Sequence, residues 1–130
     1  MEETLMKLKE VHSSSVIILL FGSSIRIYDD DVRIIEFISN LISKKRVLVC
    51  NSKYLKNIED LLKNKKINYV VLSKELDYSI YDYYYNENNK YNKYINLSKK
   101  YNSFRKCIIY FYNFIFNIPF NRYKWYVNAH

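Results

Sequence analysis

The chain has 130 residues, a formal net charge of +8, one glycine, one proline and two cysteines. This length suits one domain with a single core and excludes two. Abundant Asn, Ile, Lys and Tyr beside scarce Gly, Pro and Ala indicate an A/T-rich genome, as in organelles, some parasites and some viruses. No apolar run approaches the roughly 20 residues that a membrane span needs, and two cysteines without a secretory leader predict free thiols in a reducing compartment.

Three short runs rich in Val, Ile and Leu predict strands. They are Val16 to Phe21, Val47 to Cys50 and Tyr69 to Leu72, and a further short strand can form over Ile25 to Tyr28. The three runs lack the polar alternation of a half-solvated strand, which is typical of parallel strands covered on both faces.

Two segments between these runs have helical spacing. In the first, apolar residues from Val32 to Ile42 recur at three and four residues behind Asp29, Asp30 and Asp31, which can cap a helix and complement its dipole. In the second, Leu55 to Leu62 form an apolar stripe, and lysines follow at the C-terminal end, where cations are favoured.

These elements predict an α/β fold, a small parallel-sheet, Rossmann-like layer with flanking helices and a basic aromatic C-terminal extension. We assign residues 1–77 to the α/β core. Residues 78–130 form a Tyr/Asn/Lys-rich segment followed by a basic aromatic block that packs on the core or on partners. From Asp77 to Tyr101 no periodicity is visible, which predicts an insertion that is disordered or ordered by a partner.

The candidate catalytic and metal sites are weak. Asp29 to Asp31 could hold Mg²⁺, but no other strand end supplies a further carboxylate or His, so a helix cap is the favoured interpretation. Gly22 is the one glycine available to a phosphate loop, and Cys50 lacks a second cysteine or a nearby His. We therefore expect no catalytic residue, metal, cofactor or small-molecule substrate.

Positive charge concentrates at the C-terminal end of the chain. Residues 86–130 hold 8 Lys/Arg against one acidic residue, Glu87, whereas residues 1–85 hold 13 against 12. Cations can neutralise phosphates and aromatic rings can stack on unpaired bases, so this region predicts contact with RNA or DNA. The candidate contacts there are Lys99, Lys100, Arg105, Lys106, Arg122, Lys124 and Trp125.

Residues 11–82 resemble the front part of small-subunit ribosomal protein two of bacteria and organelles. The resemblance runs through Val11-His12, Phe21-Gly22, Ile25 to Asp29, Lys44 to Lys53 and Tyr69 to Val71. Ser73 to Tyr78 stand where the family has its Trp-Leu-Gly-Gly-Thr-Leu-Thr-Asn signature. The order of strand, polar turn and helix is also similar to the second RecA-like lobe of helicases, without that family's arginine finger.

The first resemblance implies a non-catalytic constituent of a small ribosomal subunit, mitochondrial and organelle-encoded. It implies ribosomal RNA and neighbouring ribosomal proteins as partners, no membrane, and rRNA contacts at Lys44, Lys45, Arg46 and Lys53. Two alternatives stay open. One is an accessory subunit of a viral or plasmid transcription or replication complex, in the cytoplasm of a virus or parasite host. The other is a small Mg²⁺-dependent enzyme that uses Asp29 to Asp31.

Overall fold

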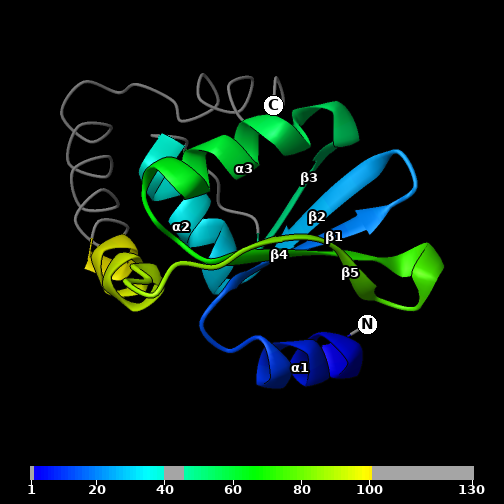
Figure 1. The fold of residues 1–130 in the computed structure, drawn as a ribbon, viewed down its shortest axis with the longest axis horizontal. Coiled ribbons are helices and arrows are strands. Elements are labelled where there is room, and N and C mark those ends of the chain that lie inside the picture. The colour runs from blue at the N-terminus through cyan, green and yellow to red at the C-terminus, as the bar shows by residue number, and fades with distance from the viewer. Residues whose placement is uncertain (1, 40–45, 101–130) are drawn as a thin grey trace, which may run out of the picture.

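A computed structural model describes residues 2–39 and 46–100 (Figure 1). These residues form α1 (Glu2–Val11), β1 (Val16–Phe21), β2 (Ser24–Tyr28), α2 (Asp30–Ser39), β3 (Val47–Asn51), α3 (Leu55–Asn64), β4 (Tyr69–Ser73) and β5 (Ser79–Tyr84). Short 3-10 turns at Ser52–Tyr54 and Lys74–Leu76 follow β3 and β4, and residues 91–100 are helical.

The predicted α/β class is confirmed, and the sheet is mixed rather than purely parallel. Its strands lie in the order β3-β2-β1-β4-β5, in which only β1 and β4 are parallel neighbours. The three predicted apolar strands do run in the same direction. However, β2 lies between β1 and β3 and is antiparallel to both, and β5 is antiparallel to β4.

A two-residue turn explains why β2 lies beside β1. Gly22 and Ser23 connect the strands, and Gly22 has a φ of 59°, which a glycine adopts without steric cost. Such a short connection forces the two strands into an antiparallel hairpin. β2, which continues to α2, therefore lies between the predicted strands Val16 to Phe21 and Val47 to Cys50.

Helices cover the two faces of the sheet unequally. Figure 1 shows α1 on one side of the sheet and α2 and α3 on the other. The larger core lies on the α2–α3 side and includes Ile18, Ile27 and Val71 from the strands, with Tyr91 from the last helix. The smaller core on the other side contains Ile17, Leu19, Val70 and Leu72, against which Leu8 of α1 packs. Burial from both sides explains the continuous apolar runs of β1 and β4. The run in β3, at the edge of the sheet, was expected to be covered on both faces as well, but Val49 is 55% exposed.

The stretch expected to lack regular structure contains a strand and a helix. Asp77 and Tyr78 adopt φ values of 54° and 59°, which reverse the chain after β4 and start β5 alongside it. Tyr91 and Ser98 in the helical stretch are buried. The sheet and its core thus continue beyond residue 77. The prediction relied on aliphatic periodicity, which this stretch lacks because Tyr side chains fill its core positions and asparagine side chains cap its turns.

Several predicted features lie outside the described residues. They are the aromatic C-terminal block, the second cysteine Cys107, and the candidate RNA contacts Lys44, Lys45, Arg105, Lys106, Arg122, Lys124 and Trp125. Among the helices of the described part, none is long and apolar enough to cross a membrane.

Candidate nucleic-acid interface

The turn that ends α3 presents three lysines. The helix closes with two backbone hydrogen bonds, from Lys66 N–H to Lys63 C=O (3.0 Å) and from Ile67 N–H to Leu62 C=O (3.0 Å). This is the Schellman arrangement, with Lys66 in the left-handed conformation (φ 57°) where glycine is usual. Ile67 and Leu62 are both fully buried, so the turn is anchored in the core while Lys63 and Lys66 remain exposed.

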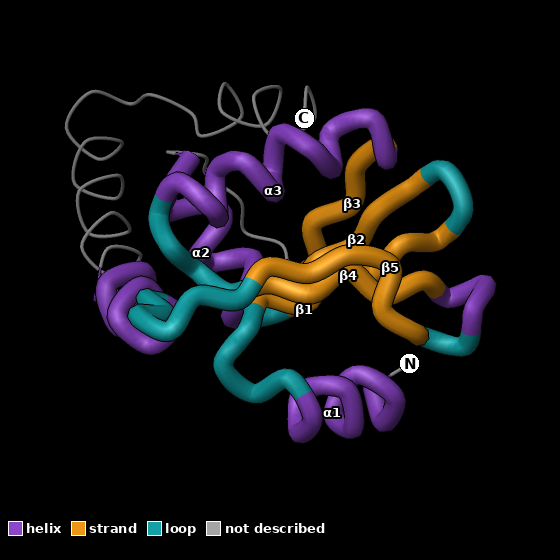
Figure 2. Tube along the Cα trace, viewed as in Figure 1, coloured by secondary structure: helices purple, strands orange, loops and turns teal. Residues whose placement is uncertain are grey.

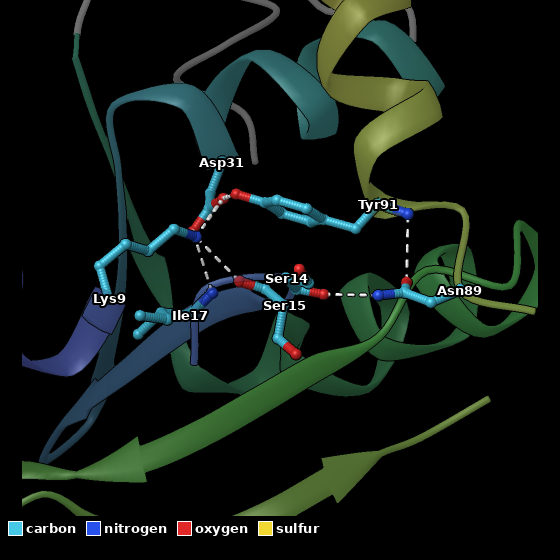
Figure 3. A network of polar contacts seen from close by, with 7 residues as sticks. All are labelled: Lys9, Ser14, Ser15, Ile17, Asp31, Asn89 and Tyr91. Atoms are coloured by element: carbon cyan, nitrogen blue, oxygen red, sulfur yellow. Dashed lines mark hydrogen bonds and ion pairs between the residues drawn. The ribbon is translucent and has the colours of Figure 1, made fainter. Parts of the chain in front are cut away.

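Asparagines hold the next segment of chain against this turn. Asn68 Oδ1 accepts a hydrogen bond from Asn86 N–H (2.8 Å). Asn89 Oδ1 accepts hydrogen bonds from the N–H groups of Asn68 (3.0 Å) and Tyr91 (3.1 Å), the second of which caps the helix that starts at residue 91. Asn89 also donates from Nδ2 to the Ser14 carbonyl (2.6 Å), a contact drawn in Figure 3.

The two segments meet directly at Lys66 and Lys90. The N–H group of Lys90 donates a 3.0 Å hydrogen bond to the Lys66 carbonyl, although 24 positions separate the two residues in sequence. This contact places two lysine-bearing segments side by side, and we call their lysines the lysine patch: Lys63, Lys65, Lys66, Lys90 and Lys93.

The amines of the lysine patch are available to a ligand. Lys63, Lys66 and Lys93 are exposed, and the other two are half-buried. No carboxylate within residues 2–39 and 46–100 forms an ion pair with any of them. The Lys93 amine lies 6.0 Å from the centre of the Tyr94 ring. Lysines on adjacent segments of the chain supply the positive charge that binding a polyanion requires.

The structure places four of the predicted RNA contacts, and it does not bring them together. Arg46 is exposed just before β3, and its carbonyl accepts the Asp29 N–H (2.7 Å). Lys53 follows the other end of β3, with its amine 5.2 Å from the Tyr54 ring centre. Lys99 and Lys100 are exposed on the same helix as Lys93, about 9–10 Å further along its axis.

The carboxyl ends of β1 and β4, where α/β proteins commonly bind ligands, carry a packed cluster. The ring of Phe21 lies under two cations, with Arg26 4.4 Å and Lys74 4.9 Å from its centre. Because both cations already cover this ring, the cluster is better explained as packing at the end of the sheet than as an open binding surface.

The aspartate triplet does not form a metal site. Asp29 and Asp30 are exposed, whereas Asp31 is buried and points into the protein. Figure 3 shows its carboxylate surrounded by donors: Lys9 Nζ at 2.9 and 3.0 Å, Ile17 N–H at 3.0 Å and Tyr91 O–H at 2.7 Å. Within the described residues no group of three His, Cys, Asp or Glu side chains could hold a metal ion.

The predicted acidic start of α2 is present, with Asp30 and Asp31 in its first turn, and Asp31 has a further role that the sequence did not indicate. The helix α2 begins at Asp30, and its first turn is closed by a backbone bond from Val32 N–H to the Asp29 carbonyl (3.0 Å). The Asp31 carboxylate instead joins α1, β1 and the last helix. Sequence reasoning missed this role because no local pattern identifies Lys9 and Tyr91 as its partners.

Cys50 has the properties of a structural thiol. It is half-buried at the end of β3, packs against the larger core, and is free. Burial raises the pKa of the Cys50 thiol, which opposes formation of the reactive thiolate.

Comparisons with other proteins add no identification, since no family model and no curated protein matches this chain.

Proposed function

We propose that the protein is a non-catalytic, RNA-binding constituent of a ribonucleoprotein, the small ribosomal subunit of a mitochondrion. The observation that carries the RNA-binding part is the hydrogen bond between Lys90 and Lys66, which assembles the lysine patch from two distant segments. The ribosomal part rests on the resemblance of residues 11–82 to ribosomal protein two and on the A/T-rich composition.

Two candidate reactive groups have structural roles in the described residues. The Asp31 carboxylate is fully engaged by internal donors, and burial disfavours the Cys50 thiolate. We infer that the cationic surface of the α/β fold contacts the phosphates of folded RNA rather than supporting a reaction. Neighbouring ribosomal proteins would be further partners.

RNA affinity measured against salt tests the binding proposal. We expect the logarithm of the affinity to fall linearly with the logarithm of salt concentration, by about 0.7–0.9 per phosphate contact. The combined variant Lys66→Glu, Lys93→Glu should lower affinity for RNAs of every sequence. The matched control, Lys7→Glu with Lys56→Glu, changes two exposed lysines on α1 and α3 by the same total charge.

The control should lose much less affinity than the patch variant. Equal losses would show that only net charge matters and would refute the lysine patch as a site. Sedimentation of the tagged protein with the small ribosomal subunit tests the assembly. Recovery with a polymerase at similar stoichiometry would instead support the accessory-subunit alternative.

A further inference from the structure

The outer strand of the sheet carries tyrosines that the fold leaves in solvent. In β5 and directly after it, the relative exposure is 65% for Tyr83 and 71% for Tyr85. Two exposed aromatic side chains this close in the chain are a candidate contact surface for a ligand or partner, since tyrosine is enriched at interfaces.

Strand alternation places the Tyr83 ring on the face opposite Tyr84. Tyr84 points to the larger core and stacks on Tyr69, with ring centres 5.9 Å apart and an interplanar angle of 22°. Tyr83 is the cross-strand partner of Val70, whose side chain belongs to the smaller core on the α1 side. Tyr83 therefore faces the α1 side, and Tyr85 follows two residues later, directly after the end of β5.

The backbone beneath these tyrosines is fixed. Hydrogen bonds to β4 hold the strand on one side. At the other end, the N–H group of Asn86, next to Tyr85, donates to Asn68 Oδ1 (2.8 Å). Two rings on such a strand lose little conformational freedom when a planar ligand packs on them.

A short stretch of chain connects these tyrosines to the lysine patch. Figure 2 shows the chain leaving β5 and running through a loop to the last helix. Lys90 lies five residues after Tyr85, where its backbone meets Lys66. One carboxylate on this path, Glu87, is exposed. Aromatic rings followed by unpaired amines are the combination that binds a single-stranded nucleic acid, because bases stack on the rings and phosphates contact the cations.

The edge of β5 is less suited to a protein strand. Adding a strand requires free backbone donors along the edge, but the Tyr83 N–H is already bonded to Asp82 Oδ1 (2.9 Å). The register shift between Val71 and Leu72 further disturbs the regular ladder. These features favour stacking on the side chains over pairing with the backbone.

We propose that Tyr83 and Tyr85 form a stacking platform for unpaired bases of an RNA strand whose phosphates lie on the lysine patch. This inference rests on the proposed RNA-binding function and specifies its ligand as single-stranded RNA. It is distinct from the predicted aromatic contact at Trp125, which lies outside the described residues.

The test compares a single-stranded oligouridine of about 12 nucleotides with a blunt RNA duplex of the same length, both titrated against the full-length protein. We expect the single strand to bind more tightly. Tyr83→Ala and Tyr85→Ala should each weaken single-strand binding roughly 5- to 150-fold, the range measured for loss of one base-stacking ring. Duplex binding should change little, because duplex bases are not open to stacking.

Two controls separate stacking from other effects. The Phe variants at both positions keep the ring and should retain most of the affinity, whereas Ile80→Ala removes an exposed apolar side chain of the same strand and should have little effect. Each variant is first shown by thermal unfolding to be folded.

The outcomes distinguish this inference from the proposed function. Binding of neither RNA form would contradict both. Salt-dependent binding of single strand and duplex with equal affinity, unchanged in the Ala variants, would refute the stacking platform and leave RNA binding intact. A loss in the Phe variants as large as in the Ala variants would assign the effect to the hydroxyls and would also refute stacking.

Discussion

The Tyr91 hydroxyl donates a 2.7 Å hydrogen bond to the buried Asp31 carboxylate and so joins the last described helix to the first turn of α2. Lys9 of α1 bonds the same carboxylate and lies 4.7 Å from the centre of the Tyr91 ring. Burial raises the pKa of Asp31, and the Lys9 ammonium with the hydrogen bonds acts against that shift. One carboxylate thereby links three helices and, through Ile17, the central strand.

Removal of this carboxylate should destabilise the fold strongly. We expect Asp31→Ala to lower the free energy of unfolding by about 3–5 kcal/mol, because Lys9 loses its partner and the Tyr91 hydroxyl its acceptor. Tyr91→Phe should cost about 1–2 kcal/mol. Urea unfolding measures both, and the exposed neighbour variant Asp30→Asn should change stability by less than about 0.5 kcal/mol. If Asp31→Ala matched that control, the buried network would not be a determinant of stability.

A second buried carboxylate, Glu59 of α3, predicts a dependence of stability on pH. Burial, followed by the nearby Asp82 carboxylate, raises the pKa of Glu59 from 4.5 to about 7. Between these values the folded state binds more protons than the unfolded state, so the free energy of unfolding should fall as pH rises from 4.5 to 7 and stay lower above it.

Glu59→Gln should remove this decline and raise stability near pH 8 by on the order of 1–3 kcal/mol. The measurement is urea unfolding at several pH values between 4 and 8. Asp60→Asn, which alters an exposed carboxylate on the same helix, is the control and should leave the pH profile unchanged. A wild-type protein whose stability rises steadily through this range would contradict the assignment.

The left-handed residue at the end of α3 predicts a stabilising substitution. Lys66 adopts a φ of 57°, which costs a non-glycine residue about 1 kcal/mol, so Lys66→Gly should raise the free energy of unfolding by about 0.5–1 kcal/mol. Lys65 has a φ of −93°, so Lys65→Gly should bring no such gain. Both variants remove one charge from the lysine patch, and both should weaken RNA binding. Thermal unfolding and RNA titration of the pair separate the conformational effect from the charge effect.

The strands and helices that were predicted correctly are those with a clear aliphatic pattern in the sequence. Val16 to Phe21 and Tyr69 to Leu72 identified β1 and β4, and the apolar stripes after Asp31 and from Leu55 to Leu62 identified α2 and α3. The position of β2 depends on the tight turn at Gly22, a local feature that favours a two-residue hairpin. Neighbouring strands in the sheet could otherwise not be inferred, because a run of buried residues does not indicate its partner.

The candidate interface was less predictable than the fold. The lysines were visible, but the lysine patch exists only because Asn68 and Asn89 hold residues 86–91 beside the turn after α3. These are contacts between side chains and backbone N–H groups, which leave no periodic trace. The residues that order this part of the chain are asparagines. In the sequence they cannot be distinguished from the many asparagines that an A/T-rich genome produces.

Asn89 provides the sharpest test of that ordering. Its side chain accepts from the N–H groups of Asn68 and Tyr91 and donates to the Ser14 carbonyl, so Asn89→Ala would leave these partners unsatisfied. We expect a loss of about 1–3 kcal/mol in the free energy of unfolding, together with faster proteolytic cleavage between residues 83 and 100. Asn88→Ala is the matched control, since Asn88 is exposed and, within residues 2–39 and 46–100, bonds Asn86 Oδ1 through its backbone N–H rather than its side chain. Rapid cleavage of the wild-type chain in this stretch, at the same rate as in Asn89→Ala, would show that these hydrogen bonds do not order it. The lysine patch would then have no fixed geometry.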